Sequence, residues 1–376
     1  MNFGFTEEQE HLRKTVCDVL ADHASMKRVR EVMEDPDASH DAALWRQMSE
    51  LGWLGLAFPE AVGGAELSLI EQCIVLEELG RVLAPTPFLP TAIAADAILQ
   101  LGSPAQRATW LPRMASGEIK ATLALTEEAG DAPEAIELAA SRADEGFTLS
   151  GRKLFVPDAA AADLLVVVAR TGGEGAKGLA ALLVPADAPG LLVEPMRAMD
   201  LLRPLSVVSF ADTPVPKAAL LGGESDSAGA LEHVLDRARV MLCAESVGAA
   251  ERCLEASVQY AKERVQFGKP IGVNQAIKHK CADMLFAVES ARSITYYAAW
   301  AAEHAPDEAA TTASMAKSYV SDAFRSAAAD NIQIHGGVGF TWEYDCHLYF
   351  KRAKSNEAWL GDGIEHRERV ARLLKL

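Results

Sequence analysis

The sequence predicts a mostly helical protein with a small β domain in its middle, and two observations carry that prediction. Apolar residues repeat with the spacing of amphipathic helices over about 1–117 and again over about 223–376. Between them, over about 118–222, short apolar runs are separated by Gly, Pro and Asp, which is typical of strands joined by turns. We therefore expect three domains, 1–117, 118–222 and 223–376, as the chain of 376 residues exceeds one typical domain.

The first segment reads as helices with recognisable starts and stops. Thr6 and Gln9 have the spacing of a capping box, which predicts a helix start. Pro85, Pro87 and Pro90 predict a kinked connection between two later helices. The helices expected after the first one are separated by Gly and Pro and cover 41–51, 69–79, 91–101 and a short stretch from 104.

The middle segment contains short alternating or continuous apolar runs of strand length. We expect the strands at 147–150, 164–168, 179–184 and 205–210. The Gly-rich stretch 172–178 is similar to a phosphate loop, but it lacks Ser or Thr after Lys177 and joins strand to strand. We predict a hairpin loop there.

The third segment returns to helical spacing, with Ala-rich faces that allow close packing within a bundle or between subunits. A four-helix bundle is expected, with helices at 227–265, 274–304, 307–334 and 346–372.

Composition excludes some classes of partner. The net charge of −17 argues against nucleic acid or an anionic membrane as the main partner. The six cysteines are scattered without a C-x-x-C pair, which indicates reduced thiols and predicts no metal site. No apolar run approaches membrane-spanning length, and the N-terminus starts with an acidic helix instead of a signal peptide. We expect a cytoplasmic protein.

Two short motifs are the most informative part of the chain. The first, over 260–271, carries Arg264, Gln266 and Phe267 at the end of a long helix. The Arg264 guanidinium can bind a phosphate with two hydrogen bonds, and the aromatic ring of Phe267 is expected beside it. The second, over 333–340, carries Gln333 before Gly336 and Gly337, so that bare backbone can approach a ligand. Together they suit the pyrophosphate and adenosine of a dinucleotide.

These motifs resemble the acyl-CoA dehydrogenase family, whose pattern Arg-x-x-Phe-Gly plus Gln-x-x-Gly-Gly-x-Gly-Phe reaches across a subunit boundary to FAD. The resemblance extends over the whole chain, because the family has a helical domain, a middle β-barrel or sandwich and a four-helix domain in that order. It implies FAD as cofactor, an acyl-CoA substrate and electron-transferring flavoprotein as acceptor. It also implies at least a dimer, expected to be a homotetramer, or a heteromer with a second family member.

The resemblance also assigns the other half of the flavin site and a coenzyme A contact. Thr126 and Phe155 match the family's flavin loop and flavin strand, although Pro157 replaces a threonine there, and Gln275 belongs to the subunit-crossing half. Asp236 and Arg239 match a family Asp-x-x-Arg that holds the pantetheine. An ordinary ion pair on a helix surface is the alternative for these two residues.

The family's catalytic base has no counterpart here. Its usual Glu position is occupied by Leu360, and the second known location is occupied by Ala238. Glu245 is the one acidic residue in an apolar stretch two turns beyond Ala238, so it is our candidate base. The alternative is a Glu paired with a neighbouring helix.

Other polar residues near the missing base have ordinary explanations. Asp362 and Glu365 are expected to cap a helix N-terminus. His335 and His347 are expected to be structural, because neither has metal-ligand spacing.

Three functions therefore stay open from the sequence. The first is a working FAD-dependent dehydrogenase of lipid metabolism with a displaced base, and the second is a non-catalytic partner subunit of a heteromeric dehydrogenase. The third is a flavin oxidase or monooxygenase on the same fold. The sequence does not identify the acyl group, the acceptor or the pathway.

Overall fold

The computed structural model describes residues 4–35, 37–172, 178–222 and 228–376. Contacts between residues divide the chain into two compact units. The first unit comprises Met1–Glu31, Leu69–Ala84 and Arg239–Leu376. The second comprises Val32–Ser68 and Pro85–Ala238.

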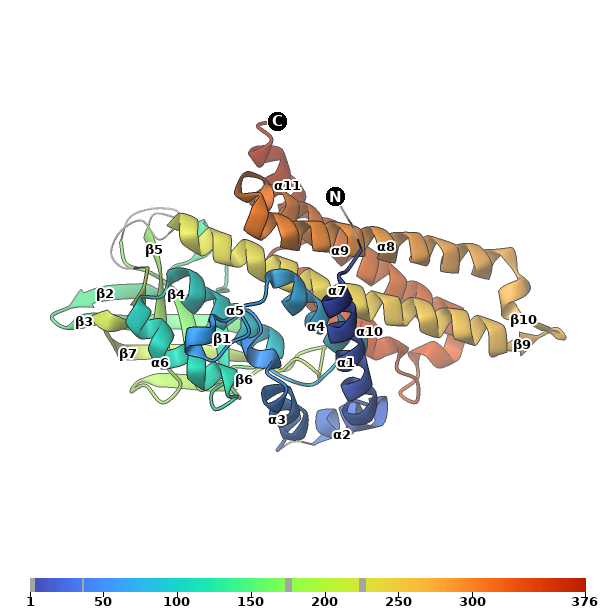
Figure 1. Ribbon diagram of the computed structural model, residues 1–376, viewed down its shortest axis with the longest axis horizontal. Helices are drawn as coiled ribbons and strands as arrows, with labels where there is room; N and C mark the ends of the chain where they lie inside the picture. The colour runs from blue at the N-terminus through green and yellow to red at the C-terminus, as the bar shows by residue number, and fades with distance from the viewer. Residues whose placement is uncertain (1–3, 36, 173–177, 223–227) are drawn as a thin grey trace. The chain divides into compact units, whose positions relative to one another are not determined.

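The first unit is helical apart from one small hairpin. It contains α1 (Glu7–His23), α4 (Leu69–Arg81), most of α7 (Ala228–Glu263), α8 (Gln275–His304), α9 (Pro306–His335), α10 (Cys346–Ala358) and α11 (Gly363–Leu373). α8 and α9 pack against each other, and α10 and α11 pack against α9 (Figure 1). Thr6 forms the predicted capping box with Gln9 at the start of α1. The α2 helix (Met26–Glu34), which was not predicted, follows α1.

The prediction of one continuous helix over 346–372 is wrong. α10 ends at Ala358 and α11 begins at Gly363, because Leu360 and Gly361 adopt positive φ angles of 61° and 90°. A left-handed residue interrupts the helical hydrogen-bond ladder.

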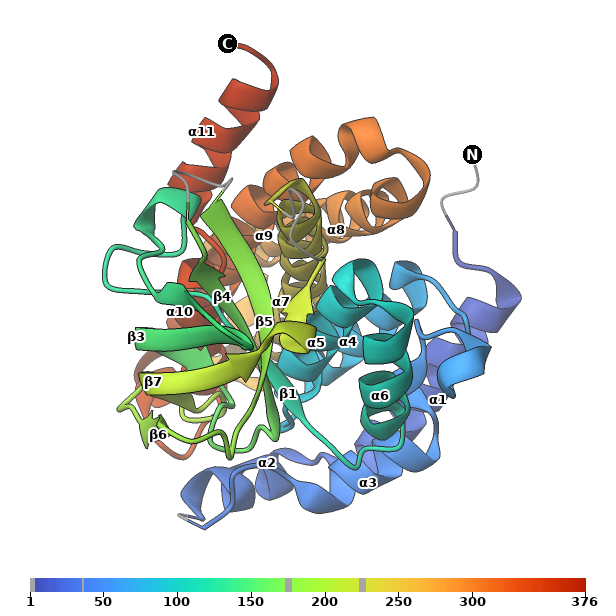
Figure 2. The same ribbon diagram turned by 90° about the vertical axis from the view of Figure 1, so that its left-hand side faces the viewer.

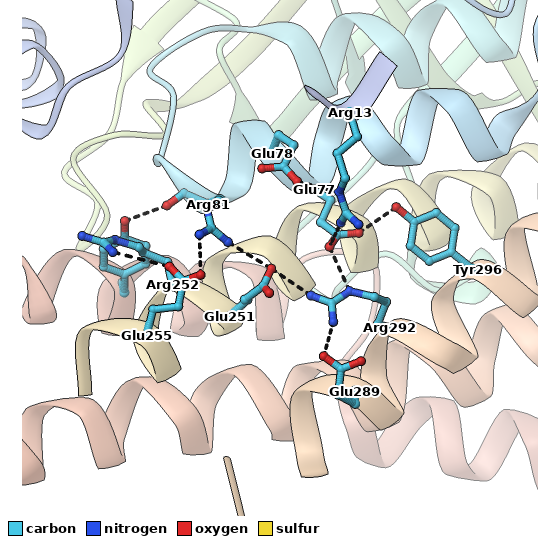
Figure 3. Close-up of polar contacts among 11 residues, drawn as sticks. Arg13, Glu77, Glu78, Arg81, Glu251, Arg252, Glu255, Glu289, Arg292 and Tyr296 are labelled. Atoms are coloured by element: carbon cyan, nitrogen blue, oxygen red, sulfur yellow. Dashed lines mark hydrogen bonds and ion pairs between the residues drawn. The ribbon is translucent and has the colours of Figure 1, made fainter. Parts of the chain in front are cut away.

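A cluster of ion pairs holds α1, α4, α7 and α8 together (Figure 3). Its centre is Glu77 on α4, whose side chain is 1% exposed. The Glu77 carboxylate is ion-paired with Arg13 and with Arg292 Nε at 3.0 Å, and it accepts a hydrogen bond from Tyr296 Oη at 2.6 Å. We call this set, with the peripheral members Glu78, Arg81, Glu251, Glu255 and Glu289, the Glu77 cluster.

α4 and α7 approach so closely beside this cluster that two glycines are required. A Cβ atom on Gly80 would lie 2.0 Å from the carbonyl oxygen of Glu245. A Cβ atom on Gly248 would lie 1.7 Å from the carbonyl oxygen of Glu77. Both distances are far inside van der Waals contact, so the backbone of α7 around Glu245 is fixed against α4.

The second unit combines short helices with one mixed sheet (Figure 2). Its helices are α3 (Ala42–Glu50), α5 (Phe88–Leu101) and α6 (Pro104–Ala115). Its sheet contains β1 (Ala121–Ala124), β2 (Ala139–Ala143), β3 (Gly146–Pro157), β4 (Leu164–Arg170), β5 (Leu179–Pro185), β6 (Leu191–Pro195), β7 (Leu205–Pro216) and β8 (Leu220–Leu221).

The strand order in this sheet is β6-β7-β3-β2-β4-β5-β8, with β1 paired to β4. β1 and β2 each run parallel to β4, and the β2–β4 pairing is short. The other strand pairs of this sheet are antiparallel. β4 and β5 are buried almost throughout and form the centre of this unit's core. α5 packs against β1.

Several local expectations for the second unit need correction. α5 begins at Phe88, so Pro90 lies in its first turn. The N–H groups of a first turn have no acceptor within the helix, so a proline costs no hydrogen bond there. β1, β2 and β6 were not predicted, because their short sequences carry no clear alternation. Residues 173–177 of the predicted hairpin loop at 172–178, and the predicted helix start at 227, lie outside the described residues.

No helix in the described ranges combines the length and apolarity needed to cross a bilayer.

Candidate functional site

The first unit presents Arg264, Gln266 and Phe267 on a β-hairpin that follows α7. α7 ends at Glu263, earlier than predicted, and β9 (Val265–Gln266) pairs with β10 (Lys269–Pro270). Phe267 and Gly268 form the two-residue turn, with φ angles of 51° and 76°. The chain therefore leaves the helix in a tight, defined turn.

The side chains of this hairpin point away from the body of the unit. Phe267 is fully exposed at 103%, and Arg264, Gln266 and Gln275 are exposed as well. Within the described part of the chain, no hydrogen bond or ion pair holds the Arg264 guanidinium. A long apolar ring without a packing partner inside its own chain indicates a contact with something else.

The second motif lies where α9 ends. Gly336 has φ 68° and ψ −143°, a conformation that favours glycine, and it ends α9 after His335. A Cβ atom built on Gly336 or Gly337 would meet no atom within 4 Å. Gln333 is exposed one turn earlier. The backbone here is open to a ligand.

A pocket of about 400 Å³ joins the two motifs. It is lined by Arg264 from the hairpin and by His335, the residue before Gly336. Tyr260 also lines it and stacks on His335, with ring centroids 4.1 Å apart. The structure thus brings the two motifs, which are separated widely in the sequence, to one end of the first unit.

The second unit carries Thr126 and Phe155 side by side. Thr126 lies in the loop after β1, and its carbonyl oxygen accepts a hydrogen bond from Leu154 N at 2.8 Å. Phe155 is the next residue on β3 and is 48% exposed. The backbone bond therefore fixes the loop against the strand next to an accessible aromatic ring.

The coenzyme A candidates lie on α7. Asp236 is 5% exposed, and Arg239 Nε donates to Leu360 O at 3.4 Å. Arg237, which the sequence analysis passed over, holds Asp96 with its Nε at 2.9 and 3.0 Å from the two carboxylate oxygens. Arg239 is thus directed to the turn that carries Leu360.

The turn where the resemblance predicts the family's base carries the buried side chain of Leu360. Leu360 is 1% exposed, and its carbonyl oxygen also lies 2.8 Å from His366 Nε2. Burial lowers the pKa of His366 to about 3, so its ring is neutral at pH 7 and donates from Nε2. Asp362 caps α11 in a capping box with Glu365, as predicted, and backbone hydrogen bonds lower the pKa of Asp362.

Lys317 is a further part of this turn that the sequence analysis missed. It is 1% exposed and donates from Nζ to the carbonyl oxygens of Asn356 and Glu357 at 3.0 and 3.1 Å. A cation at the end of α10 satisfies carbonyl groups that the helix leaves without partners. No signal in the sequence distinguishes this lysine from one on a helix surface.

Glu245, the candidate base, lies in a buried polar group. Its Oε1 is 3.3 Å from Arg352, and its Oε2 accepts a hydrogen bond from Asn356 Nδ2 at 3.1 Å. Both carboxylate oxygens of Glu245 therefore contact side chains of α10. This geometry favours the alternative that we kept open, a Glu paired with a neighbouring helix.

The two histidines that we expected to be structural both lie in aromatic contacts. His335 Nδ1 is 2.8 Å from Asn331 O, and its ring stacks on Tyr260. His347 stacks on Trp342, with ring centroids 4.9 Å apart. Across the described ranges, no group of three or more His, Cys, Asp or Glu side chains could hold a metal ion.

Comparison with known proteins covers the chain nearly from end to end. The chain matches three domain families: the acyl-CoA dehydrogenase N-terminal domain at residues 6–118, the middle domain at 122–212 and the C-terminal domain at 229–375. The chain belongs to the acyl-CoA dehydrogenase family. Acyl-CoA dehydrogenase IpdE2 of Mycobacterium tuberculosis is 35% identical to it over 348 residues, which is 92% of this chain and 91% of that protein.

Solved structures of acyl-CoA dehydrogenases have the same fold. Butyryl-CoA dehydrogenase from Megasphaera elsdenii matches with a TM-score of 0.91 and 26% identity, covering 100% of both chains. A chain of the ChsE4–ChsE5 complex from Mycobacterium tuberculosis matches with a TM-score of 0.90 and 30% identity, covering 100% of this chain and 99% of that one. The predicted order of a helical, a β and a helical domain is confirmed. The protein is an acyl-CoA dehydrogenase, an oxidoreductase that acts on CH–CH groups.

Proposed function

We propose that the protein binds FAD between subunits and uses it to remove hydrogens from C2 and C3 of an acyl-CoA thioester. One observation carries the proposal: Arg264 and the Gly336–Gly337 turn lie at one end of the first unit, open to solvent. Such an arrangement suits a ligand that lies outside the core of its own chain.

The residues present fit the phosphate part of FAD. An arginine fork can hold a diphosphate with two parallel hydrogen bonds. The open space beside Gly336 and Gly337 lets the backbone of this turn approach a bulky ligand closely. Phe267 is fully exposed and offers a flat apolar face to a ring system.

We assign the remaining contacts residue by residue. Gln266, Gln275 and Gln333 supply amide groups from the lending subunit. Thr126 and Phe155 lie on the flavin-ring side of the receiving subunit, where Phe155 can stack on the ring. Asp236 and Arg239 hold the pantetheine of coenzyme A. FAD supplies the hydride acceptor for C3.

The proton at C2 is the unsolved part of the chemistry. A positioned carboxylate contributes roughly 10²–10⁴ in rate to such a proton transfer. Leu360 supplies none, and Glu245 is held by Arg352. We therefore propose that Glu245 anchors α10 and that turnover is low unless a carboxylate reaches the site from the substrate or another chain.

Assembly and partners follow from the shared flavin site. We propose at least a dimer, and a tetramer as the working form, through the C-terminal helices. Electron-transferring flavoprotein is the proposed acceptor, lipid metabolism the proposed context and the cytoplasm the proposed compartment. The matched ChsE4–ChsE5 complex, which contains two different chains, supports testing a second family member as partner.

The alternative of a non-catalytic partner subunit rests on the altered segment 155–157 and on Leu360, in contrast to the intact segments 264–275 and 333–340. Such a subunit would keep the residues it lends and lose its own base. The relatives are themselves acyl-CoA dehydrogenases, which favours the working enzyme.

One experiment separates these functions. We expect the FAD-loaded protein to be reduced anaerobically by at least one member of an acyl-CoA panel without any partner chain. Leu360→Glu should accelerate this reduction, and Glu245→Gln should leave the rate of the folded fraction within about tenfold of wild type. A loss of 10²-fold or more in Glu245→Gln would make Glu245 the base, and reduction only with a partner chain would establish the alternative.

A further inference from the structure

Phe155 adopts a backbone conformation that is unusual for an aromatic residue. Its φ angle is 54°, in the left-handed region that non-glycine residues rarely occupy. The residue lies in an irregularity of the β3–β7 pairing, where the register shifts between Lys153 and Val156. A bulge of this kind redirects a side chain, and here it exposes the Phe155 ring. Something must hold the strand in this conformation.

The loop after β1 is fixed to β3 at three consecutive residues, Leu125, Thr126 and Glu127. Lys153 Nζ donates to Leu125 O at 2.9 Å, and Leu154 N donates to Thr126 O at 2.8 Å. Lys153 Nζ also donates to Glu127 Oε1 at 2.5 Å. Hydrogen bonds therefore join residues 125–127 to Lys153 and Leu154, the two residues that precede Phe155.

Glu127 extends this attachment to a third segment. Its Oε2 accepts from Glu137 N at 2.7 Å, and its carboxylate accepts from Leu138 N at 3.0 and 3.2 Å. These two amides lie immediately before β2. Glu127 thus ties the loop to β2 and, through Lys153, to β3.

The Lys153–Glu127 pair is buried, with the lysine side chain 0% and the glutamate side chain 10% exposed. Burial lowers the pKa of Lys153 to about 8, whereas the charge of Glu127 acts to raise it. Desolvation offsets much of the attraction in a buried ion pair, so such a pair is weak evidence for stability and is better explained by the geometry that it imposes.

The neighbouring ion pair provides a direct contrast. Arg152 and Glu128 come from the same two segments, one residue away, and they also form an ion pair. Their side chains are 57% and 70% exposed, so this pair is screened by solvent and constrains little. Both pairs join β3 to the loop after β1, but of the two only the inner pair is buried.

We infer that Lys153 and Glu127 are positioning residues that hold Thr126 and the bulged Phe155 in the arrangement required to receive the flavin ring. The inference rests on the proposed FAD function. It assigns to this pair a role in flavin affinity and flavin environment in addition to any part in folding.

The test replaces both charges at once, because removing one alone leaves a buried charge without its partner. In Lys153→Met/Glu127→Gln, Met keeps the length of the lysine stem and Gln keeps an oxygen that can accept from Leu138 N. We expect the apoprotein to fold, with faster hydrogen exchange at the amides of Leu154 and Leu138. We expect FAD to dissociate at least about tenfold more readily and the absorption spectrum of the bound flavin to shift.

Arg152→Met/Glu128→Gln is the matched control, and its FAD affinity and flavin spectrum should equal those of wild type. Glu127→Asp, which keeps the charge but shortens the reach of the carboxylate to Glu137 N and Leu138 N, is the second variant, should the double variant fail to fold. Wild-type FAD affinity and an unchanged spectrum in the inner-pair variants would overturn the inference while leaving the proposed function standing. Absence of FAD binding by the wild type would instead overturn the proposed function, and the inference with it.

Discussion

The Glu77 cluster and the Arg264 hairpin lie in the same helical unit and use the same kinds of side chain in opposite ways. In the Glu77 cluster, Arg13 and Arg292 are bound to carboxylates inside the chain (Figure 3). In the hairpin, Arg264 is exposed beside a fully exposed Phe267. The first group satisfies its polar atoms internally, whereas the second presents them to something outside the chain.

This difference separates structural from functional residues better than residue type does. A buried, fully paired charge contributes to folding, and its removal leaves partner charges unsatisfied. An exposed arginine next to an unpacked aromatic ring contributes little to folding and is available for binding. Substitutions in the two groups should therefore affect different measurements.

The largest effect is expected at the centre of the cluster. Glu77→Gln removes a charge that holds Arg13, Arg292 and the Tyr296 hydroxyl, so the free energy of unfolding should fall by roughly 3–5 kcal/mol. Urea denaturation of the apoprotein measures this change. Glu289→Gln is the control, because Glu289 pairs with the same Arg292 but is 55% exposed, and it should change stability by about 0.5 kcal/mol or less. Equal effects of the two substitutions would contradict the comparison.

The hairpin should respond in the opposite way. Arg264→Ala should weaken FAD retention by roughly 10–100-fold, the contribution of a charged hydrogen bond, with thermal stability of the apoprotein unchanged. FAD retention by Arg264→Lys should lie between that of wild type and that of Arg264→Ala, because a point charge replaces a bidentate fork. Lys262→Ala, in the last turn of α7, serves as control. Full flavin occupancy in Arg264→Ala would refute the assignment.

A smaller and pH-dependent effect is expected at the Leu360 turn. The pKa of His366 is about 3 in the folded chain, below its ordinary value of 6.5. The unfolded chain therefore takes up a proton as the pH falls through 6.5, whereas the folded chain stays neutral, so acid favours unfolding. This histidine should lower the free energy of unfolding by about 1 kcal/mol between pH 7 and pH 5.5. His366→Gln, which can still donate to Leu360 O, should show a correspondingly smaller pH dependence, and an identical dependence would count against a neutral buried ring.

Patterns that depend on neighbours in the chain were predictable from the sequence. The caps at Thr6 and Asp362, the long C-terminal helices and the two short motifs at 260–271 and 333–340 all arise from short-range spacing. Tertiary constraints were not visible. Leu360 looks like a helical leucine, although it adopts a left-handed conformation.

Buried charges were equally hidden. Lys317 and Glu77 occupy ordinary helical positions, and only packing of a second element reveals that each is enclosed. The same holds for Lys153, whose place under Phe155 depends on the bulge in β3. Burial of a polar side chain is set by the whole fold, so local periodicity does not report it.

The central claim is that the flavin site combines residues of two chains, and mixing subunits tests it directly. Arg264→Ala removes a lent contact, and Phe155→Ala removes a receiving one, so each variant alone should bind FAD weakly. When the two are dissociated together and reassociated, each hybrid dimer contains one site built from an intact receiving side and an intact lending side. We predict that the mixture regains tight FAD binding that neither variant shows. A mixture that binds no more FAD than the average of the two separate variants would contradict the claim.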